Sequence, residues 1–113
     1  MSVGSSEQLN FYGAAEFDGT TNARVGGTPN LAVARSATGV YTATPADSIP
    51  RNQLYVEAFP SGANAVAAIC RWDDSLGNGV IRIVTVDAAG VPVNTQFQVK
   101  VHTLGGSYGS SNS

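Results

Sequence analysis

Residues 91–103 alternate between apolar and polar side chains, and this pattern limits the fold more than any other feature of the sequence. One parity holds Val91, Val93, Thr95, Phe97, Val99, Val101 and Thr103, and the other holds Pro92, Asn94, Gln96, Gln98, Lys100 and His102. Because the side chains of a strand point to opposite faces in turn, the segment predicts a long strand with one buried and one solvated face. Strands of this kind are typical of antiparallel sheets.

Further strand-like segments recur along the chain at the spacing of an all-β fold. We expect them at residues 31–36, 40–44, 53–59, 65–72 and 80–87, with another near residues 9–17. Two connections contain a glycine suited to positive φ: Gly39 in a tight hairpin, and Gly90 closing a turn that starts at Asp87. The predicted fold is an all-β antiparallel sandwich, jelly-roll or immunoglobulin-like, of about six to eight strands with flexible termini.

The 113 residues are enough for one domain with its own core. We divide the chain into residues 1–17 as an N-terminal arm or first strand, residues 18–104 as the sandwich, and residues 105–113 as a flexible Gly/Ser tail. The first segment contains Phe11, Tyr12 and Phe17. These aromatic side chains belong either to a frayed terminus or to an arm that docks on a neighbouring chain.

Composition argues against several classes of protein. Charged residues make up 12% of the chain, the net charge is −2, and the six cations are isolated, so no basic surface for nucleic acid is expected. The longest apolar run, residues 65–70, is far too short to cross a membrane, and the polar start of the chain resembles no secretory signal. The single cysteine, Cys70, allows no internal disulfide and suits a reducing site of folding.

Residues able to carry out catalysis or bind metal are few. His102, the only histidine, falls on the solvated parity, and no neighbouring residue supplies a partner for it. Cys70 shares its parity with Val66, Ala68 and Trp72, which predicts a buried, inert thiol. The loop at residues 73–79 offers oxygen ligands, but its spacing does not fit a calcium loop. We therefore expect no enzyme, no metal and no cofactor.

The predicted strand at residues 53–59 places Tyr55, Glu57 and Phe59 together on the outward face. Two outward aromatic side chains around a carboxylate indicate a contact surface. Three kinds of contact remain open: another protein subunit, a sugar ring stacked on the aromatic rings, or a loop or arm of the same chain.

Two segments resemble modules of tailed-phage structural proteins. They are VARSATGVYTAT at residues 33–44 and VIRIVTVDAAGVPVNTQFQVKVH at residues 80–102. Such modules occur in tail-fibre domains, in head fibres and in small capsid decoration (cement) proteins. The resemblance covers about residues 14–104, and a single free-standing module is most similar to a decoration protein.

The resemblance implies a structural virion protein without enzymatic activity, commonly trimeric, made in the host cytoplasm and located on the capsid surface. Its expected partners are the major capsid protein and further copies of itself, with no role for nucleic acid or membrane. The predicted interface residues are Phe11, Tyr12, Phe17, Tyr55 and Phe59. The alternative is a receptor- or carbohydrate-binding module of a tail fibre or head fibre, which would bind a glycan.

Overall fold

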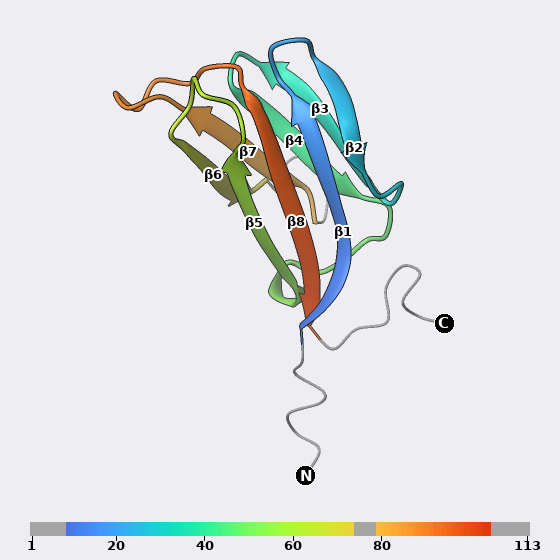
Figure 1. The fold of residues 1–113 in the computed structure, drawn as a ribbon. Coiled ribbons are helices and arrows are strands. Elements are labelled where there is room, and N and C mark those ends of the chain that lie inside the picture. Colours follow the sequence, from blue (N-terminus) through green and yellow to red (C-terminus); the bar gives the residue numbers. More distant parts are fainter. Residues whose placement is uncertain (1–8, 74–78, 105–113) are drawn as a thin grey trace.

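The computed structural model describes residues 9–73 and 79–104, which form eight strands in two four-stranded antiparallel sheets (Figure 1). Sheet A has the order β2-β1-β8-β5, and sheet B has the order β3-β4-β7-β6. The strands are β1 (Leu9–Asp18), β2 (Ala23–Gly27), β3 (Leu31–Ala37), β4 (Val40–Pro45), β5 (Leu54–Pro60), β6 (Ala67–Trp72), β7 (Ile81–Val86) and β8 (Gln96–Leu104). The predicted all-β sandwich is confirmed. The termini predicted to be flexible, residues 1–8 and 105–113, lie outside the described residues.

Only residues 96–103 of the alternating segment belong to β8. The side chains of Thr95, Phe97, Val99, Val101 and Thr103 are buried, as the alternation predicts. The strand begins at Gln96, however, and the side chain of Val91 is 53% exposed. Before β8 the chain crosses from sheet B to sheet A and stays bound to the end of β7, where the Val93 N–H donates to the Thr85 carbonyl over 2.9 Å. The prediction of a strand over residues 91–95 is therefore wrong.

Two glycines adopt the positive φ that the turns require. Gly39 has φ of +70° between β3 and β4, and Gly90 has φ of +81° at the end of the turn from Asp87. The Gly90 N–H donates to the Asp87 carbonyl over 2.9 Å, which closes a four-residue turn. Both sequence predictions for these connections are confirmed.

Strand β1 lies beside β8 along its whole length, and a β-bulge between Phe11 and Gly13 interrupts their pairing (Figure 1). A bulge adds one residue to one strand and so shifts the alternation of its side chains. As a result Phe11 points outward, whereas the neighbouring Tyr12 is only 5% exposed. The Tyr12 hydroxyl donates to Asp47 Oδ2 over 2.8 Å, and the Asp47 N–H donates to that hydroxyl over 3.1 Å.

Strand β2 was not expected from the sequence. All five of its residues are exposed, so it has no buried row of side chains to produce an alternating pattern. A single turn of 3-10 helix, Arg51–Gln53, precedes β5. The described residues include no helix long and apolar enough to cross a membrane.

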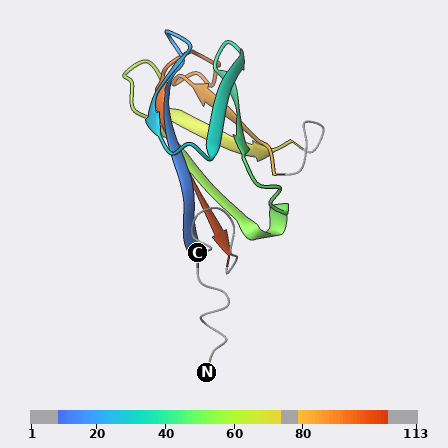
Figure 2. The same cartoon turned by 90° about the vertical axis from the view of Figure 1, so that its right-hand side faces the viewer.

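The core lies between the two sheets, which Figure 2 shows from the side. Three aromatic side chains meet there: Phe17 and Phe97 from sheet A, and Tyr41 from sheet B. Their ring centroids are 4.5 Å apart for Tyr41 and Phe97, 5.7 Å for Phe17 and Tyr41, and 6.1 Å for Phe17 and Phe97. Pairs at these distances and tilts contribute beyond their buried area, so the cluster ties sheet A to sheet B.

Asn94 links the connection before β8 to the β3–β4 hairpin. Its Oδ1 accepts a hydrogen bond of 2.7 Å from the Gly39 N–H and one of 3.4 Å from the Tyr41 hydroxyl. The alternation predicts a solvated Asn94, but the side chain turns toward these buried donors. Asn94 is half-buried because it lies before β8, where its side chain binds the hairpin instead of standing on the outer face of the sheet.

Candidate interaction surface on sheet A

The outer face of sheet A presents three rows of side chains, each running across β1, β8 and β5. Strand register places Phe11, His102 and Tyr55 in the first row, Ala14, Lys100 and Glu57 in the second, and Glu16, Gln98 and Phe59 in the third. Neighbouring strands lie about 4.8 Å apart, so each row spans about 10 Å. We call these nine residues, together with Leu9, the sheet A face.

The first row is the most apolar part of the sheet A face. Phe11 is 51% exposed and Tyr55 is 46% exposed. The ring of Phe11 meets the ring of His102 edge-on, with centroids 5.8 Å apart. Beside this row is an open hollow of about 450 Å³, lined by Leu9, Tyr55, Val56, Glu57 and His102.

The other two rows are mostly polar and contain one lysine and two glutamates. Lys100 lies directly opposite Glu57 in the strand register, so a cation and an anion are neighbours at the centre of the face. Glu16 accepts hydrogen bonds from two amide side chains, Gln96 over 2.5 Å and Gln98 over 3.4 Å. Phe59, 42% exposed, ends the third row on the edge strand. The face thus combines exposed aromatic rings with little net charge.

The structure separates the five predicted interface residues into two groups. Phe11, Tyr55 and Phe59 lie exposed on the sheet A face, and the described part of the chain leaves them uncovered. Tyr12 and Phe17 are buried in the core, where Phe17 belongs to the aromatic cluster. Residues 9–17 of the predicted arm or first strand lie in β1.

The sequence analysis did not identify two residues of the sheet A face. Leu9 is exposed beside the hollow, and His102, interpreted as an isolated solvated histidine, meets Phe11. The parity of residues 91–103 places His102 on the outer face, but pairing of β1 with β8 is needed to bring Phe11 to it. That pairing joins segments some ninety residues apart, and no local pattern carries it.

Cys70 and His102 do not form a pair. Cys70 packs against the core from sheet B, whereas His102 lies on the outer face of sheet A. Burial raises the pKa of the Cys70 thiol, which disfavours the reactive thiolate. Val66, predicted in the same inward row as Cys70, precedes β6 and is exposed.

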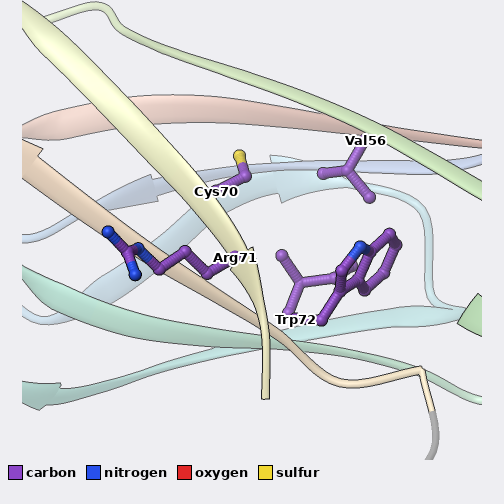
Figure 3. Close-up of a pocket in the computed structure, with 5 residues that line it drawn as sticks. Val56, Cys70, Arg71 and Trp72 are labelled. Carbon is purple, nitrogen blue, oxygen red and sulfur yellow. The ribbon is translucent and has the colours of Figure 1, made fainter. Parts of the chain in front are cut away.

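Cys70 also lines a small hollow at the open side of the sandwich, between β5 and β6. Figure 3 shows Val56 of β5 facing Cys70 and Trp72 of β6, with the Arg71 side chain directed away from them. The hollow has a volume of about 170 Å³, below the ~300 Å³ at which ligand pockets usually begin. It is therefore a weaker candidate site than the sheet A face.

The loop considered for calcium lies mostly outside the described residues, which omit positions 74–78. At its start Asp73 accepts a hydrogen bond of 2.9 Å from Arg82 Nε and forms an ion pair with that guanidinium. Across residues 9–73 and 79–104, no three His, Cys, Asp or Glu side chains are grouped to hold a metal ion.

Comparisons with family models, with curated proteins and with solved structures found no match to this chain.

Proposed function

We propose that this protein is a capsid decoration protein of a tailed phage, which binds the outer surface of the shell through the sheet A face and stabilises contacts between capsomers. The observation that carries the proposal is the row of Phe11, His102 and Tyr55, with two half-exposed aromatic rings on a rigid sheet. Aromatic residues are enriched at the centres of protein interfaces, where they provide much of the binding energy. The resemblance of residues 33–44 and 80–102 to phage modules supports the choice of partner.

The polar rows support the same use of this face. Glu57 and Lys100 offer one charge of each sign at the centre, and Gln98 offers an amide next to them. Protein interfaces also carry direct hydrogen bonds from polar groups, so these side chains suit the part of the contact beside the aromatic row. No reacting group is needed for such a role, since added contact area is what strengthens a shell.

The proposal is tested by co-sedimentation of the purified chain with shells of the phage that encodes it. The double variant Phe11→Ser/Tyr55→Ser removes both exposed rings of the first row and should lower binding by about tenfold or more. The control is Val91→Ser, because Val91 is exposed to the same degree but lies on the turn before β8. Point variants are needed, since deletion of residues 9–17 would remove most of β1.

Two outcomes would contradict the proposal. If the wild-type chain does not sediment with the shells, it is not a decoration protein of that phage. If the double variant binds as the wild type does, attachment uses another surface. Circular dichroism and urea unfolding of each variant show that the sandwich is intact.

A carbohydrate-binding module of a tail or head fibre is the second candidate function. It is favoured by Tyr55 and Phe59 on the edge strand, four residues apart and so about 13 Å from each other along the strand. Sugar rings stack on exposed aromatic rings, and Glu57 between them offers a hydrogen-bond acceptor. A glycan array decides this: binding by the wild type that Tyr55→Ala abolishes supports it, and no signal at high protein concentration rejects it.

A further inference from the structure

Strand β6 is an edge of sheet B whose outward backbone groups have no partner strand within residues 9–73 and 79–104 (Figure 1). The Asp73 N–H donates to the Val80 carbonyl over 3.1 Å. In the register of β6 with β7, this bond shows that Asp73, Arg71, Ile69 and Ala67 direct their backbone N–H and C=O groups toward β7. In an antiparallel ladder, the N–H and C=O groups of alternate residues point toward opposite neighbours. Three residues of β6 therefore direct these groups away from β7: Ala68, Cys70 and Trp72.

The other edge strands carry features that hinder pairing with another chain. On β2, Arg24 turns back to the Leu31 carbonyl over 2.5 Å, and a bulge at Val25 of β2 interrupts the β1–β2 register. A bulge also bends β3 near Arg35. Such bulges and charges are the usual protection of sheet edges.

Strand β5 ends in Pro60, which has no backbone N–H to offer a further strand. By contrast β6 pairs with β7 in unbroken register from Ala67 to Trp72 and contains no proline. Ile69, at its middle, is 44% exposed. Of the four edges, β6 is the one best suited to accept a further strand.

We propose that β6 pairs with β6 of a second copy of this chain, antiparallel about a twofold axis at Ile69, so that two B sheets join into one of eight strands. The pairing would be Ile69 with Ile69, Ala68 with Cys70, and Ala67 with Arg71. The outward backbone groups of Ala68 and Cys70 then form the hydrogen-bonded pairs. This inference uses the opposite sheet from the sheet A face and does not depend on the proposed function.

The side chains of β6 suit a copy of themselves. The two Ile69 side chains meet in a non-hydrogen-bonded pair, where side chains approach most closely. Arg71 lies opposite Ala67, so the two like charges of a symmetric pair are kept apart. Registers centred on Ile69 and on Cys70 each align five residues of β6, namely 67–71 and 68–72. Only the register centred on Ile69 brings the two exposed Ile69 side chains together, whereas the other sets each Ile69 opposite a charged Arg71. A twofold contact is the commonest symmetry among homo-oligomers.

Mass measurement gives the first test. Size exclusion with light scattering, at concentrations up to about 1 mM, should give twice the 11.6 kDa of the chain. Ile69→Lys places two like charges at the axis and should raise the dissociation constant of the dimer by about tenfold or more. The control is Thr44→Lys, because Thr44 is exposed on the outer face of the same sheet, on the interior strand β4. A monomer at all concentrations, or a trimer that Ile69→Lys leaves unchanged, would overturn the inference.

Cysteine cross-linking gives the register and remains informative if Ile69→Lys fails to fold. In a Cys70→Ser background, Ile69→Cys should form a disulfide-linked dimer on mild oxidation, because directly opposed residues of a non-hydrogen-bonded pair lie within disulfide reach. Arg71→Cys should not cross-link to itself, but should cross-link to Ala67→Cys when the two variants are mixed. Equal cross-linking at positions 69 and 71 would reject the proposed pairing, as would an efficient Cys70–Cys70 disulfide in the wild type.

Discussion

Tyr12→Phe tests whether the start of β1 is fixed to the sandwich by one buried hydroxyl. Removing the oxygen deletes a 2.8 Å hydrogen bond to the Asp47 carboxylate and leaves the Asp47 N–H, which donated to that oxygen over 3.1 Å, without its acceptor. A hydrogen bond to a charged group contributes about 1.5–3 kcal/mol. Asp47 is only half-buried, so water recovers part of this, and we expect a loss of about 1–2 kcal/mol in the free energy of unfolding.

Urea unfolding followed by circular dichroism measures this loss. For a chain of this size, about 1–2 kcal/mol lowers the melting temperature by roughly 5–10 °C. Tyr55→Phe is the matched control: it removes the same oxygen from an exposed ring and should change stability by less than about 0.5 kcal/mol. Combining Tyr12→Phe with Asp47→Ala should cost less than the two single changes added together, because they remove the same contact.

Two results would refute the reasoning. An unchanged unfolding midpoint in Tyr12→Phe would show that the hydroxyl does not hold β1 in place. Equal losses in Tyr12→Phe and Tyr55→Phe would mean that the burial of Tyr12 has no energetic consequence. Either result would show that the contact between Tyr12 and Asp47 does not stabilise the fold.

Three further predictions concern pH, backbone and thiol chemistry. Burial raises the pKa of Tyr12 above its ordinary value of 10, so the folded state favours the protonated hydroxyl. The contribution of that hydroxyl to the free energy of unfolding is complete below about pH 10 and is lost as pH rises through the folded-state pKa. Urea midpoints between pH 9 and 11 should therefore fall more steeply in the wild type than in Tyr12→Phe. Gly39→Ala should cost more stability than Gly90→Ala, about 2–4 against 1–2 kcal/mol by thermal unfolding. Both residues have positive φ, but a Cβ on Gly39 would lie 2.6 Å from the Val93 nitrogen, whereas a Cβ on Gly90 would meet nothing within 4 Å. Equal losses would exclude the close contact as the cause of the difference. The Cys70 thiol is half-buried and its pKa is raised, so a disulfide probe at pH 8 should label the native chain more slowly than the urea-unfolded chain; equal rates would contradict its burial.

The sequence was sufficient to predict those elements in which one face of a strand is buried and the other solvated. The row Phe97, Val99 and Val101 was predicted correctly because β8 lies inside sheet A and the core covers one side of it. The same argument predicted the outward direction of Tyr55 and Phe59 on β5. In both strands the period of two is unbroken, so local pattern and tertiary position agree.

Failures of prediction arose where the backbone departs from regular pleating or lacks a buried row. Phe11 and Tyr12 were both predicted to be interface residues, but the bulge in β1 turns Phe11 outward and Tyr12 into the core. A bulge depends on the partner strand, and β8 is distant in sequence. Strand β2 is exposed throughout and has no apolar period to detect. The alternation starts at Val91, five residues before β8 begins at Gln96. The residues between them lie beside β7, where Pro92 forms an isolated bridge with Val86.

The position of β8 between β1 and β5 has a consequence for synthesis on the ribosome. Every strand of sheet B lies within residues 31–86, so that sheet has all its strands before β8 is translated. Until then sheet A lacks the strand that joins β1 to β5. The aromatic cluster of Phe17 and Tyr41 also lacks Phe97. A nascent chain stopped before Gln96 would hold two unjoined parts of sheet A and an uncovered apolar surface on sheet B. Productive folding therefore requires the synthesis of β8, and chains released before Gln96 would expose apolar surface of the kind that promotes aggregation.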